Sequence, residues 1–332
     1  VLTQIDSITH TWSANGEIVV ARYWLGRFLE KTEPDSKQRA EILVHLGKYA
    51  QQQQGFQFAE TVLQQASRIY SRLRDDAGVA TVNEVLGWVL FDQATRRPES
   101  KAWFLASMTS RRKNGDKSGL CHALYGLICY YSLHDPGQVQ PYLDQALPLA
   151  EALDDRTMMT SLYSSRFELA DRQGDREAMR SLYPKVKRLA ETANDAYTNA
   201  WNLTRIAVHA QKLGELDDAH QITMQAMDGF HRLKSPFGIA YARFLLANIS
   251  RLRGHWRAAV EQYRECLVAA DALHQKGFGA QCALGLAMAE VERGNVEEGT
   301  FLLGRYQKIA DHFPDIEHPS CCLLYTSPSP RD

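Results

Sequence analysis

The sequence has no long apolar run and no excess of charge of either sign. No stretch approaches the ~20 apolar residues that a membrane-spanning helix needs, and no segment has the pattern of a signal peptide. Lys+Arg 38 against Asp+Glu 39 gives a formal net charge of −1, which disfavours a nucleic-acid-binding surface. We therefore expect a cytoplasmic protein without membrane or direct nucleic-acid contacts. The chain begins with Val1 and not with Met, which leaves a further N-terminal segment open.

Residues in patterns that carry catalysis are also scarce. The 6 cysteines form no Cys-x-x-Cys pair, and none of the 11 histidines stands at His-x-x-x-His spacing with a carboxylate. The stretch GRFLEKT (26–32) is one residue too short for a phosphate loop and has Glu30 in place of the second glycine. No nucleophile–base pair is visible. We predict no metal, no cofactor and no enzymatic activity, and we interpret the cysteines as buried thiols of a reducing cytoplasm.

A glycine recurs with a period of about 40 residues, which is the signature of a repeat protein. The positions are Gly16, Gly55, Gly174, Gly214, Gly254 and Gly294. The last four are 40 apart, and the gap of 119 before them equals three periods. A small residue follows each glycine by four or five positions, and a polar turn closes each unit. Between these turns, apolar residues recur at helical spacing, and no segment alternates as a strand would.

These features predict an all-α fold, an α-solenoid of stacked antiparallel helix hairpins. Each hairpin turns at its glycine, because helices often end in a left-handed conformation, which costs glycine less free energy than other residues. One hairpin cannot bury its apolar face alone, so neighbouring hairpins must stack. We place a partial repeat at 1–36, seven repeats at 37–315 and a linker at 316–321. The seven repeats start near Lys37, Ala77, Lys117, Arg156, Ala196, Pro236 and Lys276.

The turns GELDDAH (214–220), GHWRAAV (254–260) and GNVEEGT (294–300) resemble those of tetratricopeptide (TPR) repeats, in a long-repeat, MalT-like variety. The segment with Arg22, Trp24 and Leu25, and the run from Cys282 to Ala287, are similar to the ends of the helical region in bacterial signal-transduction ATPases and LuxR-type transcription regulators. The resemblance implies a sensor or regulatory arm that binds a protein, a peptide or a small effector, with an ATPase domain upstream in the same chain. The alternative is a free-standing TPR scaffold that docks partner peptides.

The last residues differ from all that precede them. CLLYTSPSPRD (322–332) contains two Ser-Pro pairs, and its back-translation resembles a sequencing adapter. We interpret 322–332 as adapter-derived and the whole sequence as a fragment. A natural Ser-Pro tail, open to phosphorylation, is the other interpretation.

In TPR arrays the first helix of each unit lines the concave face, where ligands bind. The resemblance therefore implies a candidate binding face made of polar residues on first helices. These are Asn83, Arg166, Asn202, Arg205, His209, Arg243 and Asn248. Arginines on such a face suit carboxylates. We interpret the basic stretch RRKNGDKSG (111–119) as a solvated loop, and most tryptophans and tyrosines, Trp88 among them, as packing residues.

Overall fold

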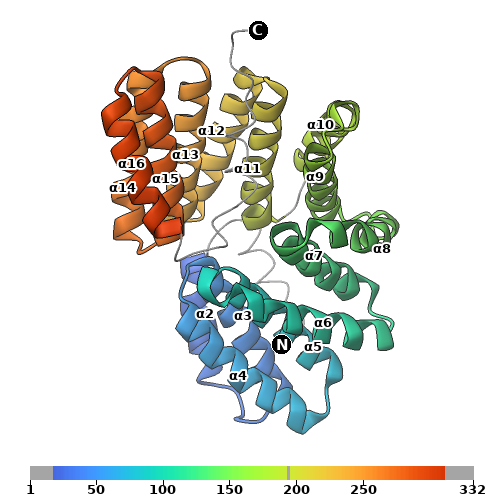
Figure 1. Cartoon of the computed structure of the whole chain (residues 1–332). Helices are drawn as coiled ribbons and strands as arrows, with labels where there is room; N and C mark the ends of the chain where they lie inside the picture. Colours follow the sequence, from blue (N-terminus) through green and yellow to red (C-terminus); the bar gives the residue numbers. More distant parts are fainter. Residues whose placement is uncertain (1–17, 193–194, 311–332) are drawn as a thin grey trace. The chain divides into compact units, whose positions relative to one another are not determined.

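Helices make up the regular structure of the described residues, 18–192 and 195–310, in the computed structural model (Figure 1). The first helices of successive pairs are α3 (Lys37–Gln52), α5 (Asp76–Phe91), α7 (Lys117–His134), α9 (Arg156–Arg172), α11 (Ala196–Leu213), α13 (Pro236–Leu252) and α15 (Lys276–Glu292). The second helices are α4 (Phe56–Leu73), α6 (Arg97–Lys113), α8 (Val139–Ala152), α10 (Arg176–Ala190), α12 (Leu216–Arg232), α14 (Trp256–Ala272) and α16 (Val296–Ala310). Helix α2 (Ile18–Leu29) precedes these pairs, and two short 3-10 turns, η1 (Ala94–Arg96) and η2 (Pro136–Gln138), precede α6 and α8. The predicted all-α fold of paired helices is confirmed.

The chain divides into two compact bodies. The N-terminal body comprises residues 1–169 and 191–197, and the C-terminal body comprises residues 170–190 and 198–332. Within the first body, α5 packs against α4, α6 and α7; within the second, α15 packs against α13, α14 and α16. Gly16 and the segment 322–332 lie outside the described residues, so the interpretation of that tail stays a prediction.

In most turns inside a pair, the predicted glycine adopts a positive φ. In one turn, the preceding residue does so instead. Gly174, Gly214, Gly254 and Gly294 have φ of +71°, +85°, +77° and +95°. After each, the next N–H reaches back to a helix carbonyl, as from Glu215 to Ala210 at 2.9 Å, which is how a left-handed residue closes a helix. In the α3–α4 turn, Gln54 takes the positive φ of 61° instead of Gly55.

Between pairs, an acceptor side chain caps several of the following helices. Asp75 and Asp116 accept hydrogen bonds from the N–H groups of Gly78 and Gly119, both at 2.9 Å, and Ser235 accepts from Gly238 at 3.2 Å. Such caps satisfy donors that the first helical turn leaves unpaired. The polar turns seen in the sequence therefore fix where α5, α7 and α13 begin.

The junction between consecutive pairs depends on a match of side-chain size. The last turns of the second helices hold Tyr70, Arg111, Ala150, Ala190, Phe230 and Ala270, and the residues eight positions later are Gly78, Gly119, Met158, Thr198, Gly238 and Phe278. A large residue is thus followed by glycine, and alanine by a larger residue. A Cβ on Gly78 or Gly238 would lie 2.2 Å from the ring of Tyr70 or Phe230. The glycine is required there because the ring fills its space.

A polar pair repeats at the other end of the first helices, with a spacing of 41 residues. Gln51 Nε2 donates to Asp92 at 2.5 Å, and Arg251 Nη1 donates to Glu292 at 2.5 Å. Lys212 pairs with Asp171 in the same way. The first two pairs each join the ends of successive first helices within one body, α3 with α5 and α13 with α15.

The size match can be tested by exchanging its two sides. Gly238→Ala should destabilise the chain by about 1–3 kcal/mol through overpacking, and Phe230→Ala by about 3–5 kcal/mol through a cavity. The double variant Phe230→Ala/Gly238→Phe copies the Ala270–Phe278 junction. It should unfold in urea at a higher concentration than Phe230→Ala alone. A double variant that unfolds at the same or a lower urea concentration than Phe230→Ala alone would contradict the size match.

Candidate functional site

The first helices of the N-terminal body present a row of half-exposed side chains on α3, α5 and α7. The row is spaced by 39 to 41 residues along the chain. It consists of Glu41, His45 and Lys48 on α3, Thr81, Glu84 and Trp88 on α5, and His122, Tyr125 and Cys129 on α7. The residues of α5 and α7 adjoin, since the Trp88 and Tyr125 rings lie 5.8 Å apart and Glu84 lies 3.9 Å from His122, and α3 contacts α5. We call these nine residues the first-helix face.

Aromatic rings anchor this face to the core. The Trp88 ring lies 5.1 Å from the ring of buried Phe104 and 5.8 Å from that of Tyr125. Phe104 itself fits between α5 and α7, since a Cβ on Gly87 or Gly126 would approach its ring to 2.6 or 2.5 Å. The indole edge that remains exposed is therefore held rigidly, as suits a contact for an apolar ligand group.

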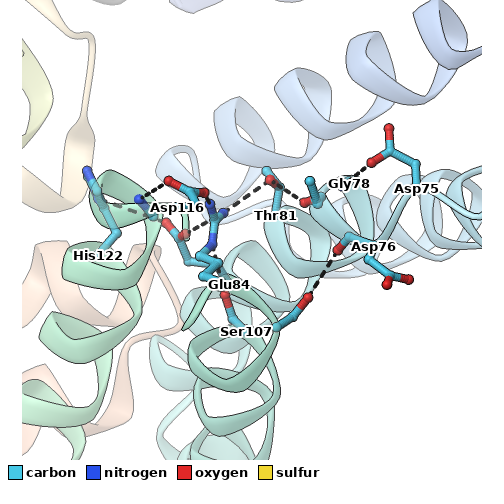
Figure 2. Close-up of polar contacts among 12 residues, drawn as sticks. Asp75, Asp76, Gly78, Thr81, Glu84, Ser107, Asp116 and His122 are labelled. Carbon is cyan, nitrogen blue, oxygen red and sulfur yellow. Dashed lines mark hydrogen bonds and ion pairs between the residues drawn. The ribbon is translucent and has the colours of Figure 1, made fainter. Parts of the chain in front are cut away.

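A buried arginine organises the polar part of the face, and Figure 2 labels its partners Thr81, Glu84, Ser107 and Asp116 together with His122. Arg111, at the end of α6, is 8% exposed. Its Nη2 donates to Glu84 Oε2 at 3.0 Å and to Thr81 Oγ1 at 3.1 Å. Its Nη1 donates to Asp116 Oδ2 at 2.5 Å, and its Nε donates to Ser107 Oγ at 3.2 Å. We call these five residues the Arg111 cluster.

The cluster connects the first-helix face with the turn between α6 and α7. Glu84, whose side chain is 12% exposed, also has its Oε1 3.9 Å from Nδ1 of His122, a side chain that is 45% exposed. At the other end, Asp116 caps α7. Burying ions costs free energy that only complete pairing offsets, so the buried Glu84 must keep its place beside Arg111.

The electrostatics of Asp116 follow from these contacts. Burial raises the pKa of its carboxyl, but the hydrogen bonds from the Gly119 N–H and from Arg111 outweigh burial, and the pKa lies below its ordinary value of 3.8. The ionised form is therefore the one that the fold stabilises.

The first-helix face offers hydrogen-bonding and stacking groups. Within 18–192 and 195–310, no group of three or more His, Cys, Asp or Glu side chains could hold a metal ion. Burial raises the pKa of the Cys121 thiol to about 12, which makes it a poor nucleophile. In the same part of the chain, no helix is both long and apolar enough to cross a membrane.

The structure distributes the seven predicted site residues over both bodies. Asn202 and His209 on α11 are 2% and 0% exposed. Arg205 on the same helix, Asn83 on α5 and Asn248 on α13 are half-buried, whereas Arg166 and Arg243 are exposed. Asn248 accepts a hydrogen bond from the hydroxyl of Tyr263 at 2.5 Å. Asn83 belongs to α5 but is not part of the row on the first-helix face, and the role of all seven stays a prediction.

The basic stretch 111–119 needs a correction. Arg112, Lys113 and Lys117 are exposed as expected, but Arg111 lies in the interior with two carboxylates. The sequence does carry a signal for this. Arg111 precedes Gly119 by the same eight residues that separate Tyr70 from Gly78, so it occupies the position of a packed ring.

Comparison with known proteins agrees with the fold. No family model and no curated protein matches the sequence. A Rap protein complexed with the Competence and Sporulation Factor is similar in structure, with a TM-score of 0.65, 11% identity, and coverage of 95% of this chain and 99% of that one. The fold is therefore a helical repeat of the TPR type, as predicted.

Two further solved structures are similar. A signal-transduction ATPase with numerous domains and a tetratricopeptide repeat sensor, from Pyrococcus horikoshii, has a TM-score of 0.51 and 13% identity over 92% of this chain, which spans 48% of that protein. Aspartyl phosphate phosphatase F from Bacillus subtilis has a TM-score of 0.50 and 11% identity over 93% of this chain and 94% of that one. At these identities the likeness concerns the fold.

The Arg111 cluster can be tested by removing its centre. Arg111→Ala should destabilise the chain by about 3–5 kcal/mol, because it leaves Glu84 buried without a partner. The double variant Arg111→Tyr/Glu84→Gln, which copies the Tyr70 junction, should recover part of the loss in urea unfolding. Arg112→Ala, one residue on and exposed, should stay within about 0.5 kcal/mol of the parent. Equal effects of Arg111→Ala and Arg112→Ala would refute the cluster.

At acidic pH, Asp116 should no longer contribute to the free energy of unfolding. Because its pKa is lowered in the folded state, its stabilisation is present above the ordinary value of 3.8 and is lost as pH falls through the folded-state pKa. Asp116→Asn keeps a capping side chain but should lower the free energy of unfolding by about 1–3 kcal/mol near neutral pH. That difference should shrink on acidification below the ordinary value. The exposed Asp76→Asn serves as control, and a difference that does not depend on pH would contradict the assignment.

Proposed function

We propose that this chain is a binding module that captures a peptide on its first-helix face, and that it acts as the regulatory arm of a signal-transduction ATPase or transcription regulator. The observation that carries the proposal is the first-helix face itself. Its side chains alternate in chemistry, with aromatic Trp88 and Tyr125 beside hydrogen-bonding Thr81 and His122. An extended peptide offers the complementary groups, since its backbone can donate and accept while its side chains stack.

The rigidity of the face also supports a binding role. Trp88 packs on Phe104, and the Arg111 cluster holds Thr81 and Glu84, so the face is ordered before a ligand arrives. Ordering in advance reduces the entropy lost on binding. The structurally similar Rap protein was solved with the Competence and Sporulation Factor, and the ATPase from Pyrococcus horikoshii carries a TPR region described as a sensor. Both are consistent with a sensing role for this chain.

Peptides selected from a random library against the whole chain would test the binding face. We expect His122→Ala and Trp88→Ala to weaken the selected peptides by about tenfold or more, the loss typical of a central contact residue. Trp103→Ala is the matched control, because Trp103 is 37% exposed on the second helix α6. Circular dichroism would verify that each variant folds. Selected peptides that bind His122→Ala and Trp88→Ala as they bind the parent would exclude this face.

The wider context needs a separate experiment. A long sequencing read across the locus should show an ATPase-coding segment upstream if the chain is a regulatory arm. A start codon close to Val1 would instead favour the free-standing scaffold.

A further inference from the structure

A pocket of about 340 Å³ opens beside α2 in the N-terminal body. Its lining comes from α2, from the end of α3 and from the start of α4. The apolar lining residues are Tyr23, Leu29, Leu46 and Phe58, and the polar ones are Arg22 and Gln53. The volume is near the lower end of the range of ~300–1,000 Å³ found for small-ligand sites. None of these residues belongs to the first-helix face or to the Arg111 cluster.

Arg22 is a half-buried cation whose partners are neutral. Its Nη1 donates to Oε1 of Gln53, and its guanidinium lies 5.5 Å from the centre of the Phe58 ring. Some arginines of this body pair with carboxylates, as Arg96 does with Glu60 at 2.7 Å, whereas others, such as Arg39, donate to neutral oxygens. Among the described residues, no carboxylate pairs with Arg22, so its guanidinium faces the pocket with only neutral partners from this part of the chain.

Gly26 keeps the pocket open. It lies on α2, one turn after Arg22, and a Cβ built on it would meet no atom within 4 Å. Leu25, the next residue toward the N-terminus, is fully buried, whereas Tyr23 is 62% exposed at the edge of the pocket. The helix thus buries one side in the core and leaves an unfilled space beside the guanidinium.

We propose that this pocket binds a carboxylate carried on a single apolar or aromatic group. A guanidinium holds a carboxylate through two parallel hydrogen bonds, and Arg22 can make them while it stays over Phe58. The leucines and Phe58 would surround the apolar group. One positive charge matches a monocarboxylate better than a phosphate dianion. The proposal is independent of the proposed function, since the two sites share no residue.

Calorimetric titration of the whole chain would test the site. The probes are 3-phenylpropanoate, a free acid, and the tripeptide Ala-Ala-Phe, which carries the same groups at its C-terminus. We expect saturable binding that weakens by about tenfold or more when either carboxylate is converted to an amide, the loss typical of a charged hydrogen bond. Tighter binding of 3-phenylpropanoate would indicate small acids as the natural source, and tighter binding of Ala-Ala-Phe would indicate peptide C-termini.

Three variants separate the site from general effects. Arg22→Gln keeps a hydrogen-bonding side chain without the charge and should weaken both probes by about tenfold. Gly26→Leu should fold, because the space beside it is empty, and should abolish binding by filling the pocket. Arg27→Gln, on the same helix but exposed, should bind as the parent does. The proposal is wrong if neither probe binds at concentrations up to about 10 mM, or if Arg22→Gln and Gly26→Leu bind as well as Arg27→Gln.

Discussion

The structure depends on a match of side-chain size where one helix pair meets the next. Each second helix ends with either a large residue or alanine, and the first turn of the following helix supplies the complement eight residues later. This rule positions the first helices, because a ring such as Tyr70 leaves no space for a Cβ on Gly78. Interiors are packed to crystal-like density, so the match determines the distance between pairs. The caps at Asp75 and Asp116 then fix where α5 and α7 start.

Arg111 follows the same rule with a charged side chain, and it thereby fixes the positions of polar groups at the first-helix face. A guanidinium at a packed position requires carboxylates, and Glu84 and Asp116 supply them from the helices on either side. The carboxylate of Glu84 is thereby held at the first-helix face, next to His122. A constraint that begins as packing thus determines which polar groups a ligand would meet there and how firmly they are held.

The sequence predicts the helix pairs, their turns and the all-α fold, because glycine positions and helical spacing are local properties. Positive φ at Gly174, Gly214, Gly254 and Gly294 confirms this. The sequence predicts less accurately which residues of the first helices are buried. Asn202 and His209 have the polarity of surface residues yet are almost fully buried, and Arg111 looks like part of a basic loop. Burial depends on how each helix is rotated about its own axis, and the 40-residue period does not determine this rotation. The eight-residue size relation does determine it, but the relation is recognised only once the structure shows which residues pack together.

The Rap protein shares this fold at a TM-score of 0.65 with only 11% identity. Size complementarity can be satisfied by Tyr–Gly, Arg–Gly, Ala–Met or Ala–Phe, so the interior constrains volume more than identity. The size match does not act directly on the half-exposed residues of the first helices, but Glu84 and Trp88 are held by Arg111 and Phe104. Fold likeness therefore carries little information about the ligand. On the proposed binding face, the packing holds Thr81, Glu84 and Trp88 in fixed positions.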